Sequence, residues 1–171
     1  MTQFKNGFTL LELLIYIAIT SLVMVSVIQG LIILNRGRGV VSARSEVLAN
    51  IRFAIEKMSQ DIKKSTNISI PETAGATSGA VEITVSDSTV RYCVVSSQLY
   101  RSVNNLCDET GELVTDPISA VDSLVFTRLE NTNAVLAKTT VSIEISLAMS
   151  YKSASPDWQY SGSSRTTVSA R

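Results

Sequence analysis

The N-terminal fifth of the chain is dominated by one long apolar run. From Leu13 to Asn35 there are 23 consecutive residues without a charge. As a helix rising about 1.5 Å per residue, this run would be about 35 Å long, enough to cross a bilayer core of about 30 Å. The pattern therefore predicts an apolar, membrane-spanning helix over residues 8–35.

A second helical pattern follows the run without an intervening linker. Its apolar positions recur every three or four residues, and basic and acidic residues occupy the other faces. This spacing predicts an amphipathic helix over residues 36–65 that packs on a globular domain. We expect one helix over 8–65, broken or bent around Gly37 and Gly39. The predicted buried stripe is Leu48, Ile51, Ile55, Met58 and Ile62.

After Asn67 the period changes from 3.6 to 2, which is typical of strands with one buried face. The alternation predicts strands near 81–85, 90–94, 98–103 and 121–129, with a turn at Ser86-Asp87-Ser88. The clearest strand comes last, and the Ser-rich segment from Ser153 onward is expected to be a mobile tail. The apolar face of that last strand is Val141, Ile143, Ile145, Leu147, Met149 and Tyr151. The fold class is therefore α+β, with an N-terminal helix packed on an antiparallel sheet.

One carboxylate, Glu12, lies at the leading edge of the apolar run. A secretory signal peptide does not fit, because its apolar core is usually about 7–15 residues long and precedes a small-x-small cleavage site. A plain single-pass anchor fits the length but does not explain Glu12. A charge at the centre of a membrane helix costs about 2.5–3.5 kcal/mol and usually marks a function.

The segment Gly7-Phe8-Thr9-Leu10-Leu11-Glu12 resembles the type IV prepilin signature, which type IV pilins share with the pseudopilins of type II secretion and competence systems. The resemblance implies that a prepilin peptidase cuts between Gly7 and Phe8 and that Phe8 is then N-methylated. Glu12 falls on the fifth mature position. The implied organisation is a leader (1–7), a transmembrane or filament-core helix (8–35), an arm helix (36–65) and an antiparallel β domain with a Ser-rich tail (66–171).

After cleavage, the new α-amine of Phe8 and the carboxylate of Glu12 would be the only charges near this end of the helix. Staggered helices could pair the amine of one subunit with Glu12 of its neighbour, and an unpaired buried charge would penalise other registers. We predict this assembly role for Phe8 and Glu12. The alternative is that Glu12 lies at the headgroup level and is merely solvated.

The resemblance also implies partners and a location. The partners are other pilin or pseudopilin subunits, the prepilin peptidase, an inner-membrane assembly platform and its ATPase. The chain would be a single-pass protein of the cytoplasmic membrane with its β domain outside the cytoplasm, and would assemble into a periplasmic or cell-surface filament. The positive-inside rule alone opposes this orientation, since the leader holds only Lys5 while several arginines follow the run.

Two later segments resemble minor subunits of the pseudopilin J and PilW-like kind. These are Phe53–Lys64, at the end of the arm helix, and Val121–Phe126, before the last long strand. We therefore predict a minor pilin or pseudopilin. The alternatives are a competence pseudopilin that aids DNA uptake and a membrane-anchored binding domain that does not polymerise. In the family the subunit at the filament tip often lacks the Glu, so the presence of Glu12 disfavours a tip role.

Composition narrows the functional classes further. The chain has 15 basic and 15 acidic residues, so no strong positive electrostatic field that would attract nucleic acid is expected. It has no histidine, so acid–base catalysis by histidine is not expected either. No nucleophile–base pair, cofactor motif or metal cluster is apparent, and we predict a protein that is not an enzyme and needs no cofactor. On an exported domain, Cys93 and Cys107 are expected to form a disulfide, although two free thiols remain the alternative.

Three lesser features have two interpretations each. The acidic residues of the Cys107 loop could bind calcium, but a solvated loop is favoured because the spacing is not that of an EF-hand. Trp158 and Tyr160 could form an exposed contact patch, but packing against the sheet is favoured. Lys63 and Lys64 are better explained by the helix dipole than by DNA binding. The acidic loop residues are Asp108, Glu109, Glu112 and Asp116.

Overall fold

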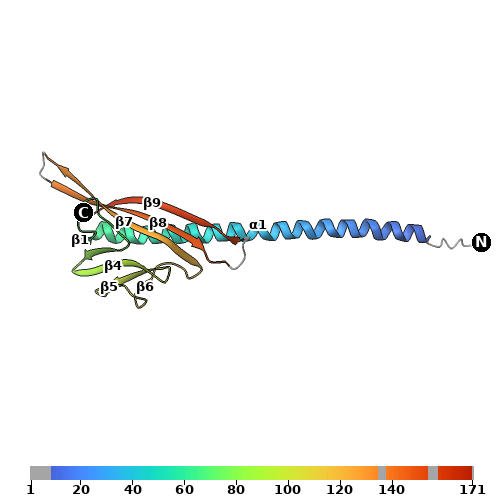
Figure 1. The fold of residues 1–171 in the computed structure, drawn as a ribbon, viewed down its shortest axis with the longest axis horizontal. Helices are drawn as coiled ribbons and strands as arrows, with labels where there is room; N and C mark the ends of the chain where they lie inside the picture. The colour runs from blue at the N-terminus through green and yellow to red at the C-terminus, as the bar shows by residue number, and fades with distance from the viewer. Residues whose placement is uncertain (1–8, 135–137, 154–157, 171) are drawn as a thin grey trace, which may run out of the picture. The chain divides into compact units, whose positions relative to one another are not determined.

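The structure is a computed structural model of the whole chain, and it describes residues 9–134, 138–153 and 158–170. A single helix, α1, extends from Leu10 to Lys64, and the strands follow it (Figure 1). The chain divides into two compact units, residues 1–39 and 40–171.

The long helix forms because its sequence contains no proline and is rich in leucine and isoleucine. Gly37 and Gly39 both lie within α1, so the helix is not broken at these glycines, and the bend that was expected as the alternative stays a prediction. Glu12 lies in the first turn, while Lys63 and Lys64 lie in the last turn. These charges complement the helix dipole at both ends.

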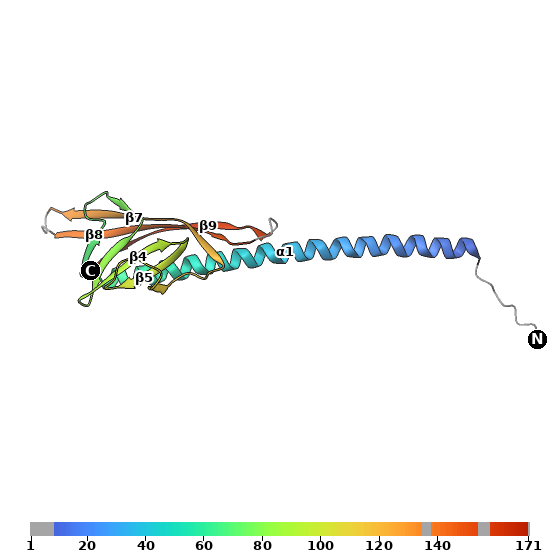
Figure 2. The same cartoon turned by 60° about the horizontal axis from the view of Figure 1, so that its bottom comes forward.

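The strands of the second unit form two antiparallel sheets (Figures 1 and 2). The five-stranded sheet has the order β1-β3-β4-β5-β6, and the four-stranded sheet has the order β2-β7-β8-β9. The bounds are β1 Asn67–Ile70, β2 Thr77–Ser78, β3 Val81–Val85, β4 Ser88–Val95, β5 Gln98–Val103, β6 Glu112–Leu113, β7 Ser119–Asn133, β8 Lys138–Tyr151 and β9 Ser161–Ser169.

Two tight hairpins build the centre of the five-stranded sheet. Ser86 and Asp87, with φ of 47° and 66°, connect β3 to β4, and Ser96 and Ser97, with φ of 50° and 61°, connect β4 to β5. Positive φ at both central residues matches the right-handed twist of the flanking strands. The turn predicted at Ser86-Asp87-Ser88 is therefore present, and β3 and β5 have the predicted bounds.

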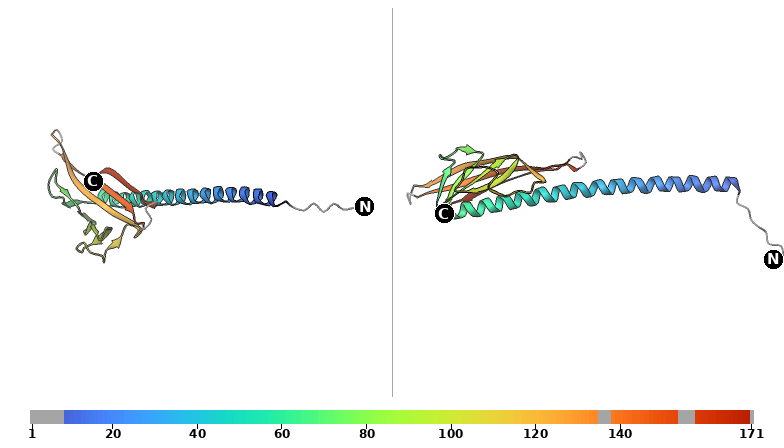
Figure 3. Two further views of the ribbon diagram at one scale, coloured as in Figure 1. Left: turned by 45° about the vertical axis from the view of Figure 1, so that its right-hand side comes forward. Right: turned by 90° about the horizontal axis from the view of Figure 1, so that it is seen from below.

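The core of the second unit combines one face of α1 with residues from both sheets. Figure 3 shows the C-terminal part of α1 running along the strands. Of the predicted stripe, Ile51, Met58 and Ile62 are fully buried, whereas Leu48 and Ile55 are only half-buried. The centre of the buried face instead includes the smaller residues Ala43, Val47 and Ala54. Small side chains let a helix lie closer to a sheet, so burial does not follow residue size alone.

The strand predicted most clearly, β8, has the expected alternation. Ile143, Ile145, Leu147 and Met149 are fully buried, and the residues between them are half-buried. The mobile tail predicted from Ser153 onward is wrong for the nine residues from Ser161 to Ser169. Ser161–Ser169 forms β9, which pairs with β8 at nine consecutive positions from Ser142↔Ser169 to Ser150↔Ser161. Hydrogen bonding to β8 and burial of Val168 order a segment whose composition suggests disorder.

The sequence analysis also missed three short strands. β1 lies beside β3, β2 beside β7, and β6 beside β5. β2 and β6 have two residues each, and the sequence predicts loops over both, at 71–79 and 104–117. Strands this short have no detectable period and exist only because a neighbouring strand holds them.

Candidate assembly surface

The first part of α1 is an apolar surface without a covering layer among the described residues. Within residues 10–35, every residue except the half-buried Gly30 is exposed. The exposed fractions reach 77% for Leu10, 70% for Leu22 and 69% for Ile33. α1 is long and apolar enough to cross a membrane. Contact with lipid or with other apolar helices would stabilise a surface of this kind by removing it from water.

Three hydroxyl side chains inside this segment bond to the backbone of the helix itself. The hydroxyls of Thr20, Ser21 and Ser26 donate to the carbonyl oxygens of Tyr16, Ala18 and Leu22 at 2.7, 2.9 and 3.0 Å. Such bonds within one helix satisfy polar groups where no water is available. These hydroxyls therefore do not prevent the segment from entering an apolar environment.

The helix begins at an N-cap that the sequence analysis did not recognise. The Glu12 amide N–H donates to Thr9 Oγ1 at 3.3 Å, and the Leu13 amide N–H donates to the Thr9 carbonyl at 3.2 Å. Thr9-Leu10-Leu11-Glu12 matches the capping-box pattern, in which Ser or Thr precedes Glu by three residues. That pattern could have located the helix start from the sequence. With Thr9 as its N-cap, α1 begins at Leu10, and Glu12 therefore lies in its first turn.

Glu12 is exposed in this first turn. Its carboxylate forms no hydrogen bond or ion pair with the rest of the described chain. Gly7 and Phe8, the predicted cleavage and methylation positions, lie outside the described residues. The pairing of Phe8 with Glu12 therefore stays a prediction, whereas the location of Glu12 at the positive end of the helix dipole is a structural fact.

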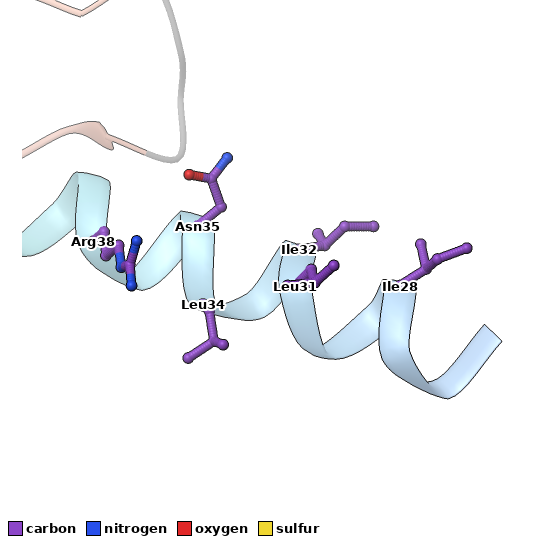
Figure 4. A pocket seen from close by; sticks show the side chains of 6 residues that line it. All are labelled: Ile28, Leu31, Ile32, Leu34, Asn35 and Arg38. Atoms are coloured by element: carbon purple, nitrogen blue, oxygen red, sulfur yellow. The ribbon is translucent and has the colours of Figure 1, made fainter. Parts of the chain in front are cut away.

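A hollow of about 450 Å³ lies along the apolar surface and is formed by one helix (Figure 4). The labelled side chains point outward from successive turns in different directions, so they form an open groove rather than an enclosed pocket. No titratable cluster accompanies them, and such a groove suits an apolar chain or side chain better than a polar ligand. Its lining residues are Ile28, Leu31, Ile32, Leu34, Asn35 and Arg38.

The four acidic residues of the Cys107 loop do not converge on one point. Asp108 accepts from the Thr110 amide and hydroxyl, Glu109 accepts from the Ser96 hydroxyl, and Asp116 accepts from the Ile118 amide. Glu112 forms ion pairs with Lys57 and Arg101. Within the described residues, no group of three or more His, Cys, Asp or Glu side chains could hold a metal ion.

The loop is attached to the five-stranded sheet by the disulfide between Cys93 and Cys107, the two cysteines that the sequence analysis paired. Cys93 lies on β4 and is 6% exposed. The bond therefore holds a segment with little regular structure against a buried strand.

The two C-terminal aromatic residues have different surroundings. Tyr160 packs against the core, and the guanidinium of Arg44 lies 5.9 Å from the centre of its ring. Trp158 is 40% exposed. The predicted packing against the domain core therefore describes Tyr160, while Trp158 is partly accessible to solvent.

A row of polar residues connects α1 to the five-stranded sheet. Asp61 accepts hydrogen bonds from the Tyr92 hydroxyl at 2.7 Å and from Arg101 Nε at 2.8 Å. Burial, and then the hydrogen bond to Asp61, raise the pKa of Tyr92 well above its ordinary value. Burial by itself would lower the pKa of Arg101, but the hydrogen bond and negative charge of Asp61 have the larger effect, so the pKa of Arg101 is raised. The Tyr92 hydroxyl therefore stays protonated and the Arg101 guanidinium stays charged, which suits a structural connection between α1 and the sheet.

The comparison with known protein families finds a match in the same part of the chain as the apolar surface. Residues 3–28 match the family described as the prokaryotic N-terminal methylation motif. No curated protein and no solved structure matches the chain. The chain therefore carries the N-terminal motif of prepilin-type proteins, and its long apolar helix followed by antiparallel sheets is consistent with a type IV pilin fold.

The match also bears on what such a chain does. The motif marks a structural, pilin-type class rather than a class of enzymes, and it implies processing by a prepilin peptidase and assembly with other pilins. With the exposed apolar helix, it suggests a membrane-anchored protein that assembles into a filament.

Proposed function

We propose that this pilin-like chain is a structural subunit, a minor pilin or pseudopilin, of a type IV pilus-like or type II secretion filament. The observation that carries the proposal is that the methylation motif at residues 3–28 coincides with the exposed apolar surface of α1. The leader is removed between Gly7 and Phe8, and Phe8 is N-methylated. The helix anchors the subunit in the membrane and then packs among other helices in the filament.

The physical support lies in the exposed apolar area. Burying one Leu or Ile side chain that is otherwise exposed stabilises by about 1.5–3 kcal/mol. The apolar segment contains many such side chains, among them Leu13, Leu14, Ile17 and Ile28, each more than half exposed. Lipid and neighbouring apolar helices can both cover them, which allows a subunit to leave the membrane for a filament core at little net cost.

Glu12 provides the register in this proposal. Its carboxylate lies in the first helical turn, and a neighbour's Phe8 amine would be its partner. In a site without water, a matched pair is tolerated, whereas either charge alone is strongly unfavourable. Only one axial stagger between subunits brings the two charges together.

The remaining details follow from the same proposal. The leader faces the cytoplasm and the β domain lies outside it, with the chain held in the cytoplasmic membrane. An assembly platform and its ATPase supply the force for extrusion. The resemblance of Phe53–Lys64 and Val121–Phe126 to pseudopilin J and PilW-like proteins supports a minor subunit of that kind, and Glu12 supports a location other than the extreme tip.

The test is the intact mass and N-terminal sequence of the chain purified from membranes of its native host. The expected chain begins at N-methylated Phe8, and Gly7→Leu should retain residues 1–7. Glu12→Ala should be missing from the sheared filament fraction, while Glu46→Ala, an exposed acid of α1 outside the apolar segment, should remain. A full-length wild-type chain would leave a membrane-anchored domain that does not polymerise.

A further inference from the structure

The second unit begins only a few positions after the apolar run ends. Asn35 is the last residue of the run, and Val40 is the first residue of the second unit. Five residues span at most about 18 Å even when the chain is fully extended. Whatever the angle between the two units, the end of the second unit that holds Val40 therefore stays close to any membrane that the run occupies.

The start of β9 lies at this same end of the second unit. The guanidinium of Arg44 is 5.9 Å from the centre of the Tyr160 ring, and Tyr160 directly precedes β9. Further along, Gly162 lies beside Ile51, since a Cβ added at Gly162 would be 3.5 Å from the Ile51 side chain. β9 therefore runs in the same direction as this part of α1. The described residues next to the start of β9 consequently belong to the end of the second unit that holds Val40.

The residues at this end combine aromatic, apolar and cationic side chains. Trp158, two positions before Tyr160, is 40% exposed, and Val41 is 69% exposed. Arg44 is exposed one turn after Val41 on the same helix face. Lys152, which directly follows β8, is also exposed. We call Val41, Arg44, Lys152, Trp158 and Tyr160 the proximal surface.

Basic residues lead the acidic ones where the chain enters the second unit. The ten residues from 36 to 45 contain three arginines and no acid. Glu46 follows, on a different helix face from Arg44. Two other acids near this end, Asp116 and Asp122, each accept a hydrogen bond within the domain. The proximal surface therefore presents cations beside its aromatic residues.

We propose that the proximal surface docks on the headgroup layer of the membrane that holds the apolar run. Trp158 would lie in the interface, where tryptophan and tyrosine are enriched because they are apolar at one end and polar at the other. Arg44 would bind lipid phosphate, since a guanidinium that lies over a ring still presents its N–H groups to an anion. Anionic lipids attract basic residues next to a membrane-spanning helix.

A polar hollow of about 370 Å³ borders the proximal surface and could receive part of a headgroup. Hydroxyl and amide groups line it, and these groups can bond to phosphate and glycerol oxygens. The headgroup layer is about 5–7 Å thick on each side of the bilayer core. The lining residues are Ser150, Tyr151, Ser153, Gln159, Tyr160 and Ser161.

The docked state deepens the proposed function and rests on its membrane anchor. It would hold the β domain against the membrane until the subunit leaves for a filament. It needs neither cleavage after Gly7 nor the carboxylate of Glu12. Gly7→Leu and Glu12→Ala chains should therefore dock as the wild type does, and failure of filament assembly would leave this result unchanged.

Trp158 is the only tryptophan of the chain, so its fluorescence reports on the proximal surface without a label. The test uses the full chain in vesicles of phosphatidylglycerol and phosphatidylethanolamine, with flotation of the vesicles as the check on anchoring. Lipids brominated near the headgroup should quench Trp158 several-fold more than lipids brominated near the chain end. The same vesicles should protect Trp158 from acrylamide, and phosphatidylcholine vesicles should protect it less.

Charge variants test the contact with phosphate. Arg44→Gln with Lys152→Gln should lower the quenching by shallow bromine several-fold. Salt at about 1 M, where the Debye length is about 3 Å, should do the same to the wild type. Arg52→Gln is the matched control, because Arg52 is exposed on α1 about two turns further from the apolar run and should leave the quenching unchanged.

Three results would overturn the docking. A chain that floats with the vesicles while Trp158 stays open to acrylamide would leave the anchor intact and remove only this inference. Protection that rises with the protein-to-lipid ratio, and not with anionic lipid, would show that a second copy covers Trp158. Equal quenching in the Arg44 and Lys152 double variant and in Arg52→Gln would rule out the contact with phosphate.

Discussion

The carboxylate of Asp61 on α1 accepts a hydrogen bond of 2.7 Å from the hydroxyl of Tyr92 on β4. Tyr92 is completely buried, and the same carboxylate oxygen also accepts from Arg101 Nε at 2.8 Å. One carboxylate thus holds two neighbouring strands of the five-stranded sheet against the helix. Tyr92 and Arg101 lie directly opposite each other in the β4–β5 pair, which allows both to reach Asp61.

Asp61→Ala should destabilise the β domain, because it leaves the buried Tyr92 hydroxyl and Arg101 Nε without their acceptor. The expected loss in the free energy of unfolding is about 1–3 kcal/mol, measured by denaturant unfolding of the full chain in detergent. Lys57→Ala is the control, since its ion pair with Glu112 is largely exposed and should contribute at most about 1 kcal/mol. Equal losses in the two variants would contradict this role for Asp61.

Alkaline pH should destabilise the fold through Tyr92. Burial and Asp61 raise the pKa of Tyr92 above its ordinary value, so the folded state favours the protonated phenol. The stabilisation is complete below the unfolded pKa of about 10 and is lost as pH rises above it. Unfolding followed between neutral pH and pH 11 should show this loss in wild type and much less of it in Tyr92→Phe. Tyr100→Phe should behave like wild type.

Reduction of the Cys93–Cys107 disulfide should destabilise the β domain. A closed loop of this length contributes about 3 kcal/mol through the entropy of the unfolded chain, and the two cysteines are 14 positions apart. Cys93→Ser with Cys107→Ser should match the reduced wild type in denaturant unfolding. If adding reductant leaves the wild-type midpoint unchanged, the bond has no such role.

Thr9→Ala should fray the start of α1. Thr9 Oγ1 accepts from the Glu12 amide at 3.3 Å, and loss of an N-cap costs about 0.5–2 kcal/mol. Amide hydrogen exchange at residues 10–13 in micelles should become faster in Thr9→Ala and remain close to wild type in Thr9→Ser. Unchanged exchange in both variants would show that the helix start does not depend on the Thr9 hydroxyl.

Gly111→Ala should destabilise the attachment of the Cys107 loop. An added Cβ would lie 2.7 Å from Ser102 Oγ and 2.9 Å from the Arg101 carbonyl oxygen, so strand β5 or the loop must shift. Overpacking of this kind costs about 1–3 kcal/mol. Gly37→Ala is the contrasting variant, since nothing lies within 4 Å of its added Cβ and alanine favours the helix. Thermal unfolding should separate the two variants in opposite directions.

Several elements could be predicted from local sequence because their physical cause is local. The uncharged run from Leu13 to Asn35 requires a helix in an apolar environment, whatever the rest of the chain does. The alternation of Val81, Ile83 and Val85, and of Ile143 through Met149, requires strands with one buried face. Of the break or bend expected at Gly37 and Gly39, the break is absent, because a glycine lowers helix propensity by only about 1 kcal/mol and the surrounding helix formers outweigh this cost.

The candidate assembly surface could likewise be located from the sequence, with one omission. Glu12 and the apolar segment were identified, but the N-cap role of Thr9 was missed although the capping-box pattern signals it. The functional pairing of Phe8 with Glu12 stays a prediction, since a partner subunit supplies half of it.

The sequence by itself determined the long apolar helix, the strands with strict alternation and the prepilin-like start of the chain. Each follows from the period and the charge of consecutive residues. Only the tertiary structure decided that the Ser-rich C-terminus is a strand, because β9 exists through its hydrogen bonds to β8. The same holds for Asp61, Tyr92 and Arg101, and for Ala43 and Ala54 at the centre of the buried helix face. Their roles depend on neighbours far away in the sequence, and no local period records those neighbours.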